Sequence, residues 1–305
     1  MQVGIIDIGS NSIKLLIGEP SQSGKFEQVL FEVEEKRIGE GMTLNPPRIL
    51  DADIEKAAMA IGRLCQIARQ YDLAGLKIVA TSAVRDASNQ RAFSKAILDK
   101  TEIGIDILSG DDEARLIGKG ALQDPKLSDL SNFVLIDLGG GSMECIQFED
   151  RIQKAHVSFN LGAVRLASTF IQDRETPLLQ ECENLIEKHV LQTLSHSPIG
   201  PDSTIRTAVL TGGASSILDG MLSRRCNATS ATISDLQSLC QEICSAKLEA
   251  RKMHLGIPRE RADIFPAAAI IIRTALEYLK CDAARFTRFN LRAGLIAEML
   301  EKEIS

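Results

Sequence analysis

The chain has 305 residues, more than one ordinary hydrophobic core accommodates and about the length of two domains. Hydrophobic residues make up 44% and charged residues 25%, a composition typical of soluble globular proteins, and no apolar run approaches the ~20 residues that cross a bilayer. The formal net charge of −6 argues against non-specific binding to nucleic acid, although a local cluster of Arg and Lys can still hold an anionic substrate.

The N-terminus predicts folded structure, because the first strand already carries Asp7 and a G-S-N-S turn. We therefore expect a cytoplasmic protein without a signal peptide and without membrane or nucleic-acid partners. The seven cysteines contain no C-x-x-C pair, which favours reduced thiols over zinc sites or disulfides: Cys65, Cys145, Cys182, Cys226, Cys240, Cys244 and Cys281. The four histidines are scattered and indicate no histidine-rich metal site.

In the first half, the pattern predicts strands over 2–8, 12–18 and 26–34, with a turn at G-S-N-S. A helix follows over 51–70, where apolar residues recur at helical spacing. A buried strand over 76–81, a helix near 88–100, a strand over 103–109 and a helix starting at 111 complete this half.

The polar stretch 123–132 predicts a domain junction. After it the order restarts with a strand, a glycine turn, a second strand and then helices. Helices are expected over 178–194, 234–252, 266–280 and 291–303, and a strand over 205–211 leads to the turn T-G-G-A-S-S. This order predicts an α/β protein of two similar domains, 1–124 and 125–305, with a cleft between them. The last helix is expected to pack back on the first domain.

Two stretches of the chain repeat one another. V-G-I-I-D-I-G-S-N-S-I-K and F-V-L-I-D-L-G-G-G-S-M-E align without a gap, so that Asp7 matches Asp137, Ser12 matches Ser142 and Lys14 matches Glu144. A single glycine turn would be explained by a tight β-turn, since glycine permits positive φ. Two copies of the same unit, followed by a third glycine turn, favour a binding function over a purely structural role for these turns.

Phosphate binding is that function, because backbone without Cβ atoms lets N–H groups converge on an anion. A carboxylate beside phosphate is repulsive unless a divalent cation lies between them, so Asp7 and Asp137 are expected to hold Mg²⁺ with waters and substrate oxygens. The expected phosphate-binding residues are Gly9, Ser10, Asn11, Ser12, Lys14, Gly139, Gly140, Gly141, Ser142, Gly212 and Gly213.

The glycine hairpins and the T-G-G-A-S turn resemble the phosphate and adenosine motifs of the acetate kinase, sugar kinase, heat-shock ATPase and actin superfamily. The set I-D-I-G-S-N-S, A-T-S-A-V-R-D-A-S-N, I-L-S-G-D-D-E-A-R-L-I and I-D-L-G-G-G-S-M-E resembles the exopolyphosphatase / guanosine pentaphosphate phosphohydrolase (Ppx/GppA) family. F-N-L-G-A-V-R-L and R-E-R-A-D-I-F-P-A-A-A-I-I-I fit its later pattern. The resemblance covers nearly the whole chain and implies two ribonuclease H-like (actin-like ATPase) domains.

The resemblance also implies residue roles. Glu113 matches the base that activates water, although Asp111 and Asp112 leave an uncertainty of one position. Arg85 matches an arginine that clamps phosphate. Asp137 and Glu144, with Asp7, match the metal side of the site, for Mg²⁺ or Mn²⁺. Met143 stands where the family usually has threonine.

The resemblance implies hydrolysis of a terminal phosphoanhydride, with inorganic polyphosphate as the first-choice substrate and a homodimer as the assembly. Three alternatives stay open: a guanosine pentaphosphate phosphohydrolase, a nucleotide-dependent kinase, and a non-catalytic regulator that binds phosphate compounds, for which Met143 is the hint. A track for a polyanion is also considered, along Arg224, Arg225, Arg259, Arg261, Arg285, Arg288 and Arg292.

Overall fold

The structure is a computed structural model that describes residues 1–21, 26–202, 204–225 and 230–304. It divides into two compact units, Met1–Pro125 with Phe289–Ser305, and Lys126–Arg288. The sequence placed 289–305 in the second domain, with its helix returning to the first. The structure groups that segment with the first unit, because helix α11 (Leu291–Ile304) packs on α4 (Gly110–Ala121) and on β1 (Gln2–Ile8).

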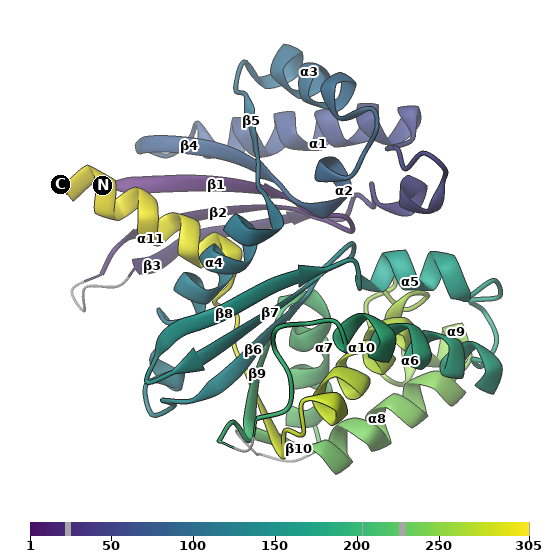
Figure 1. The fold of residues 1–305 in the computed structure, drawn as a ribbon. Coiled ribbons are helices and arrows are strands. Elements are labelled where there is room, and N and C mark those ends of the chain that lie inside the picture. Colours follow the sequence, from purple (N-terminus) through teal and green to yellow (C-terminus); the bar gives the residue numbers. More distant parts are fainter. Residues whose placement is uncertain (22–25, 203, 226–229, 305) are drawn as a thin grey trace. The chain divides into compact units, whose positions relative to one another are not determined.

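The first unit is built on a five-stranded sheet in the order β3-β2-β1-β4-β5 (Figure 1). Strands β1, β2 (Ile13–Pro20) and β3 (Phe26–Glu34) form an antiparallel meander, and β4 (Leu73–Ala80) and β5 (Ile105–Ile107) run parallel to β1. The side chains of β1 are almost all buried, which explains its continuous apolar sequence.

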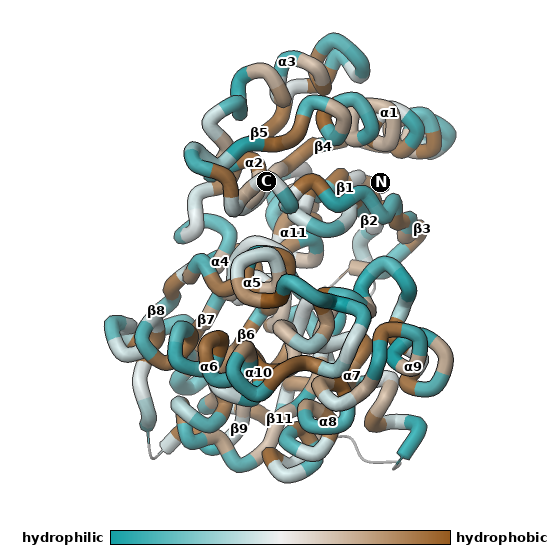
Figure 2. Tube along the Cα trace, turned by 90° about the vertical axis from the view of Figure 1, so that its right-hand side faces the viewer, coloured by the Kyte–Doolittle hydropathy of each residue, from teal (hydrophilic) through white to brown (hydrophobic). Residues whose placement is uncertain are grey.

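Helices cover both faces of this sheet. Figure 1 shows α1 (Asp51–Ala68) and α3 (Gln90–Thr101) on one face, and α4 and α11 on the other. Ile6 and Ile8 of β1 pack with Ile61 and Leu64 of α1 in one hydrophobic core. In Figure 2, β1 carries the hydrophobic colour, whereas the coil of α1 alternates between hydrophilic and hydrophobic residues, as expected for a helix that buries one side. Short helical turns η1 (Glu40–Thr43) and α2 (Ser82–Arg85) complete the unit.

The second unit repeats this plan with a six-stranded sheet in the order β10-β11-β9-β6-β7-β8. Strands β6 (Phe133–Leu138), β7 (Met143–Glu149) and β8 (Ile152–Phe159) form the antiparallel meander, and β9 (Thr207–Thr211) runs parallel to β6. Strand β11 (Ala283–Phe286) is parallel to β9, and the short β10 (Ser230–Thr232) is added at the edge. The predicted duplication of an α/β domain is thus confirmed.

The helices of the second unit are α5 (Ala163–Phe170), α6 (Gln180–Leu194), α7 (Gly212–Ser223), α8 (Ile233–Ser245), α9 (Leu248–Met253) and α10 (Phe265–Tyr278). Helix α10 lies at the centre of the core, since its residues from Ala267 to Ile272 are nearly inaccessible to solvent. No helix among the described residues has both the length and the apolar composition that a membrane span requires.

One predicted helix, 234–252, is wrong, because the structure breaks it into α8 and α9 at Ala246 and Lys247, which adopt extended backbone. The break turns the buried side chain of Arg251 back toward the end of α8. Its guanidinium donates to the carbonyl oxygens of Ile243, Arg174 and Thr176 at 3.1, 3.1 and 3.2 Å. A buried arginine satisfied by three carbonyls compensates for the interrupted helix.

The cysteines generate a first prediction. The six that the structure describes are unpaired, and all but Cys182 are buried; Cys226 lies outside the described residues. Burial raises the pKa of the Cys145 thiol to about 12 and that of Cys281 to about 11, so both remain protonated at pH 8. Because alkylation requires the thiolate, we expect iodoacetamide to modify Cys182 of the folded protein well before Cys145 or Cys281.

Residue-resolved mass spectrometry after timed alkylation measures these rates. In denaturant, where burial is lost, all the cysteines are expected to react alike. Equal rates for Cys145 and Cys182 in the folded protein would contradict the buried placement of Cys145.

Candidate functional site

The first glycine turn joins β1 to β2. The turn is closed by the N–H of Gly9, which donates to the carbonyl oxygen of Ser12 at 3.1 Å. Gly9 does not have positive φ, so its backbone conformation does not require glycine. A Cβ at Gly9 would lie 3.2 Å from the Ser12 carbonyl oxygen, so the close approach of the backbone limits the side chain at this position. The N–H of Gly39 donates to the carbonyl of Ser10 at 2.9 Å and packs a second segment onto the turn.

The side chains of this turn are mostly buried. Asn11 is held by two neighbours: its amide donates to Glu35 at 3.2 Å and its carbonyl oxygen accepts from Arg37 at 3.0 Å. The Ser10 hydroxyl is buried and makes no hydrogen bond in the structure. A buried hydroxyl without a partner costs free energy, so Ser10 is a donor available for a ligand oxygen.

Glu113 lies in the first turn of α4 and is buried, with only 6% of its surface exposed. Its carboxylate accepts a hydrogen bond from Arg85 at 2.7 Å, and the same nitrogen of Arg85 donates to the Leu108 carbonyl at 3.1 Å. The predicted base and the predicted phosphate clamp therefore contact one another. The pair is formed because α2 ends at Arg85 and α4 begins directly after β5.

The neighbouring acids differ from Glu113. Asp111 and Asp112 are exposed, and Asp112 is engaged in capping α4, since its backbone N–H donates to the Ser109 hydroxyl at 3.1 Å. Of these three acids only Glu113 is buried and bound to Arg85, and this environment favours Glu113 as the candidate base.

Asp7 has a cation as its partner. Its carboxylate accepts from Arg292 of α11 at 2.6 Å, and both side chains are about nine-tenths buried. Lys14 lies directly opposite Asp7 in the β1–β2 pairing. The sequence predicts that Asp7 holds a metal ion, whereas the structure places two cationic residues around it.

The second glycine turn joins β6 to β7, and its carbonyl groups accept hydrogen bonds from residues of helix α5. The Gly139 carbonyl accepts from Ala163 N–H at 3.0 Å, the Gly140 carbonyl accepts from Val164 N–H at 2.8 Å, and the Gly141 carbonyl accepts from the Arg165 side chain at 2.9 Å. In a trans peptide the C=O and N–H point in opposite directions. The N–H groups of the three following residues, 140–142, are therefore directed away from α5, which is the arrangement that binds an anion.

Gly162 allows the turn and helix α5 to approach closely enough for these hydrogen bonds. A Cβ at Gly162 would lie 2.2 Å from the Gly140 carbonyl oxygen, so a side chain there cannot be accommodated without moving the loop. The F-N-L-G-A-V-R-L stretch thus has a physical role, which is to hold the second glycine turn by its carbonyl side.

Two carboxylates face one another beside this turn. Asp137 and Glu144 are directly opposite in the antiparallel β6–β7 pairing, and they are 8% and 2% exposed. Glu144 also accepts a hydrogen bond from the Ser158 hydroxyl at 2.7 Å. Like charges directly opposite on neighbouring strands are destabilising, whereas one or two carboxylates with waters and phosphate oxygens are the set that Mg²⁺ prefers. These residues therefore fit a divalent cation.

The described residues contain no group of three or more His, Cys, Asp and Glu arranged to hold a metal ion. The Asp137–Glu144 pair consequently fits a cation that takes its remaining ligands from water and substrate.

The third glycine turn leads into a helix, because β9 ends at Thr211 and α7 begins at Gly212, whose φ is +92°. A Cβ at Gly212 would lie 2.4 Å from a carboxylate oxygen of Asp137, and one at Gly213 would lie 1.8 Å from the Arg261 guanidinium. Gly212 is required by its positive φ and by the Leu138 carbonyl oxygen 2.7 Å from the position of a Cβ, whereas the contact at Gly213 is with the end of a flexible side chain. The Thr211 hydroxyl is fully buried and makes no hydrogen bond in the structure.

Met143 lies outside this polar group. Its side chain is fully buried in the hydrophobic core of the second unit, and it occupies the position that Ile13 has in the first hairpin. Strand alternation puts Met143 on the face opposite to that of Glu144. The departure from threonine is thus a core substitution.

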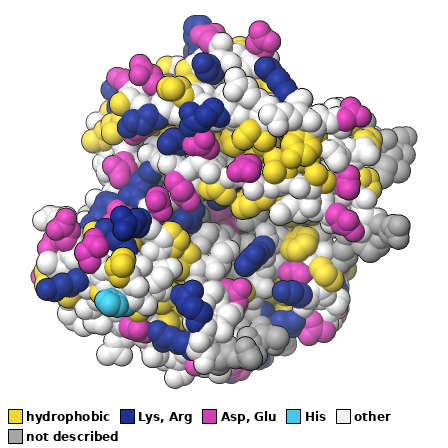
Figure 3. Space-filling view, turned by 180° about the vertical axis from the view of Figure 1, so that it is seen from behind, with side chains coloured by type: hydrophobic (Ala, Val, Ile, Leu, Met, Phe, Trp, Pro, Cys, Tyr) yellow, Lys and Arg dark blue, Asp and Glu magenta, His cyan; other side chains and the backbone are white. Residues whose placement is uncertain are grey.

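The proposed polyanion track is weakened by the structure, since several of its arginines bind other groups of the protein. Arg225 pairs with Glu242, Arg285 pairs with Asp129, and Arg224 donates to the Leu255 carbonyl. On the face shown in Figure 3, basic side chains are interspersed with acidic ones.

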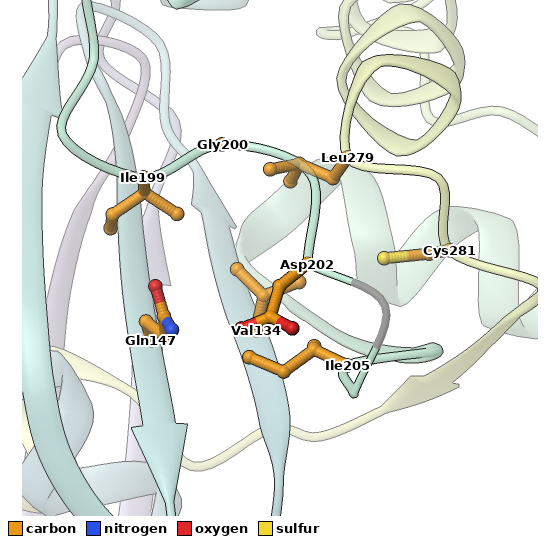
Figure 4. Close-up of a pocket in the computed structure, with 8 residues that line it drawn as sticks. All are labelled: Val134, Gln147, Ile199, Gly200, Asp202, Ile205, Leu279 and Cys281. Atoms are coloured by element: carbon orange, nitrogen blue, oxygen red, sulfur yellow. The ribbon is translucent and has the colours of Figure 1, made fainter.

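A small pocket at the start of β6 is unsuited to substrate (Figure 4). It is lined by Val134, Gln147, Ile199, Gly200, Asp202, Ile205, Leu279 and Cys281 and has a volume of about 10 Å³. That is room for about one water molecule, and Val134 lies at the opposite end of β6 from Asp137.

These features match one family of proteins. Residues 7–303 match the Ppx/GppA phosphatase family. The chain belongs to this family. It is 28% identical over 314 residues to the bifunctional 3-dehydroquinate synthase/phosphatase of Fusobacterium nucleatum, covering 98% of this chain and 46% of that protein. The chain thus spans about half of that relative.

Two further relatives are matched over nearly the whole chain. Exopolyphosphatase 1 of Mycobacterium tuberculosis is 27% identical over 314 residues, covering 99% of this chain and 89% of that protein. The guanosine-5'-triphosphate,3'-diphosphate pyrophosphatase of Vibrio atlanticus is 26% identical over 304 residues, covering 97% of this chain and 59% of that protein.

Solved structures show the same fold. An exopolyphosphatase from Cytophaga hutchinsonii has a TM-score of 0.87 at 22% identity, with 99% of this chain and 98% of that chain covered. The Ppx/GppA family member of Aquifex aeolicus has a TM-score of 0.81 at 21% identity, with 100% and 99% covered. The prediction of two actin-like domains is confirmed by these likenesses and by the repeated sheet order.

Sequence reasoning missed several residues at these turns: Ser158, Gly162, Arg165 and Thr211, together with the specific contacts of Arg261 and Arg292. Gly162 had a detectable pattern, since a glycine opens the G-A-V-R segment immediately before a helix. The Arg292–Asp7 pair had none, because 285 positions separate the two residues.

We predict that Gly162→Ala disables the second glycine turn. Its Cβ would collide with the Gly140 carbonyl, so we expect a loss of phosphatase activity of at least ~10-fold and a destabilisation of about 1–3 kcal/mol, the usual scale of overpacking. Gly200→Ala is the matched control, because nothing lies within 4 Å of a Cβ there. Phosphate release and thermal unfolding measure both effects; equal activity of the two variants would show that the loop does not depend on this close approach.

Proposed function

We propose that this chain is an exopolyphosphatase, which removes the terminal orthophosphate from inorganic polyphosphate by hydrolysis. The observation that carries the proposal is the second glycine turn, whose carbonyls are bound by α5 while two buried carboxylates face one another beside it. Amides directed away from α5 suit phosphoryl oxygens, and the carboxylates suit their counter-cation.

Several groups of the chain are candidate donors for phosphoryl oxygens. They are the N–H groups of 140–142 at the second glycine turn, and the hydroxyls of Ser10 and Thr211, which make no hydrogen bond in the structure. Arg85 offers a guanidinium that offsets charge on the phosphoryl group undergoing transfer. Such positioning and electrostatics supply most of the catalysis in phosphoryl transfer.

The chemical step assigns one role to Glu113. Its carboxylate accepts a proton from water as the water oxygen attacks the terminal phosphorus, and the bond from that phosphorus to the bridging oxygen breaks. The shortened chain leaves with the electrons of that bond. Mg²⁺ or Mn²⁺, when bound at Asp137 and Glu144, supplies positive charge that stabilises the leaving oxygen. Arg85 holds the Glu113 carboxylate in place through the 2.7 Å hydrogen bond.

Guanosine pentaphosphate is the second candidate substrate, because the relative from Vibrio atlanticus is named for activity on that compound. Both reactions hydrolyse a terminal phosphoanhydride, so the same groups serve either one. A cytoplasmic location and a homodimer are the expectations that accompany this proposal.

The alternative of a non-catalytic regulator is no longer favoured by any feature of the chain that was offered for it. It depended on Met143, and that side chain lies in the core. A kinase is also less favoured, since a buried carboxylate bound to Arg85 in the position of Glu113 suits the activation of water.

We predict that Glu113→Gln removes turnover. The amide retains the shape of the side chain but cannot accept the proton, so we expect kcat for phosphate release to fall by at least ~100-fold. The assay uses long polyphosphate, tripolyphosphate and guanosine pentaphosphate, and the preferred substrate of the wild type distinguishes the two candidate functions. Asp111→Asn is the control, since Asp111 is exposed on the same helical turn. Undiminished turnover in Glu113→Gln would remove this residue from the mechanism.

We predict that Glu144→Gln weakens the cation site. Loss of one of two facing carboxylates is expected to raise the Mg²⁺ concentration for half-maximal activity about 10–100-fold, the scale seen when groups that support a metal are removed. Calorimetric binding of Mn²⁺ provides a measurement that needs no turnover. Glu149→Gln changes an acid at the end of the same strand and is expected to leave both quantities unchanged; equal effects of the two substitutions would place the cation elsewhere.

A further inference from the structure

The Asp7–Arg292 pair joins the first glycine turn to the C-terminal helix. The Arg292 guanidinium donates to the Asp7 carboxylate at 2.6 Å, and the exposed fractions of the two side chains are only 11% and 9%. Removal of one partner of a largely buried ion pair leaves the other charge uncompensated and is strongly destabilising. The position of Asp7, two residues before Gly9, is thus coupled to that of Arg292.

Arg292 is itself held from two sides. The guanidinium lies over the Phe31 ring of β3, with 5.5 Å from its central carbon to the ring centroid, a geometry in which cation and ring attract. Its backbone lies in the first turn of α11, which packs on β1 and β2. The arginine therefore has little freedom to leave Asp7.

Helix α11 is fixed to the helix that carries Glu113. A Cβ at Gly294 would lie 2.0 Å from the Leu116 carbonyl, and a Cβ at Gly120 would lie 2.1 Å from the Asn290 carbonyl. The two helices thus cross at backbone contact, within one turn of Arg292 on α11. Arg115–Glu298, at 2.7 Å, joins the same helices at their surface.

The two hairpins differ in charge at equivalent positions. Lys14 faces Asp7 across the first hairpin, whereas Glu144 faces Asp137 across the second. The aspartate of the first hairpin thus has Lys14 opposite it on β2 and Arg292 of α11 bound to its carboxylate. The second presents two acids, a combination that suits a divalent cation.

We propose that Arg292 is a positioning residue that serves Asp7 in place of a metal ion, so that the divalent cation is held by the second hairpin alone. Arg292 fixes the Asp7 carboxylate at the end of β1, and through it the first glycine turn, in register with the α4 helix that carries Glu113. The inference deepens the proposed function, on which its activity measurements rest, and it replaces the expectation that Asp7 is a metal ligand.

The test compares Asp7→Asn, Arg292→Met and the double variant with the wild type. Mn²⁺ binding by calorimetry is expected to stay within about 2-fold of wild type in all three, because neither residue is a ligand. Each single variant is expected to lower kcat at least ~10-fold with a smaller change in KM, and the double variant to be no worse than Arg292→Met, as for residues that act as one unit. Arg292→Lys, which keeps the charge, should recover part of the loss.

Two controls bracket the result. Glu144→Gln is expected to weaken Mn²⁺ binding in the same calorimeter. Arg115→Met removes an exposed ion pair between α4 and α11 and is expected to leave kcat and Mn²⁺ binding unchanged, since exposed pairs contribute little.

Two outcomes overturn the proposal. A loss of Mn²⁺ affinity of 10-fold or more in Asp7→Asn, with Arg292→Met unaffected, would make Asp7 a metal ligand. Multiplying effects of the two substitutions on the unfolding equilibrium constant would show that the residues act independently. Calorimetry and unfolding need no turnover, so they decide this inference even if the wild type releases no phosphate from any of the substrates tested.

Discussion

The planarity of the peptide group is the constraint on which the second glycine turn depends. Helix α5 binds the carbonyls of Gly139, Gly140 and Gly141, and a trans peptide then has only one direction left for each following N–H. Under the proposed function, this arrangement prepares the turn for an anion before any ligand arrives, and it requires Gly162, where a side chain would collide with the loop. Binding to a preformed nest avoids the ordering free energy that a mobile loop would lose on binding.

One backbone motif serves two electrostatic purposes in this chain. Both hairpins have an aspartate at the end of the first strand and a tight glycine turn after it. The residue opposite that aspartate is Lys14 in one and Glu144 in the other, so the facing pair is formally neutral in the first hairpin and doubly negative in the second. A lysine compensates the charge of the aspartate that it faces, whereas two facing carboxylates are ligands of the kind that a divalent cation takes.

The sequence predicts the local part of this arrangement well, because strands and turns depend on neighbours. Strands on both sides of the glycine turns after Asp7 and Asp137 were predicted from the repeat, and the structure pairs them as two antiparallel hairpins. The sequence did not predict contacts between residues that lie far apart in the chain. The break at Ala246 depends on carbonyls that Arg251 meets in the fold, and the pairing of Asp7 with Arg292 depends on a helix that returns from the C-terminus. Spacing in the sequence could not show that the Asp7 carboxylate pairs with this arginine.

In the proposed mechanism, the contact between Glu113 and Arg85 reconciles two requirements that conflict in hydrolysis of a polyanion. A carboxylate must be ionised to accept the proton of water, yet an ionised carboxylate repels the phosphoryl group that it must approach. Arg85 offsets that charge at 2.7 Å, and its second bond, to the Leu108 carbonyl, fixes the guanidinium beside the start of α4. The guanidinium has five N–H donors in a rigid fork, and both of these contacts use one nitrogen. The Nε of Arg85 lies 3.7 Å from the Asp86 carboxylate, so in the proposed mechanism Nη2 is the nitrogen that meets phosphoryl oxygens. Burial then matters in a second way, because Glu113 lies largely out of water and its interaction with Arg85 is screened less than a surface pair would be.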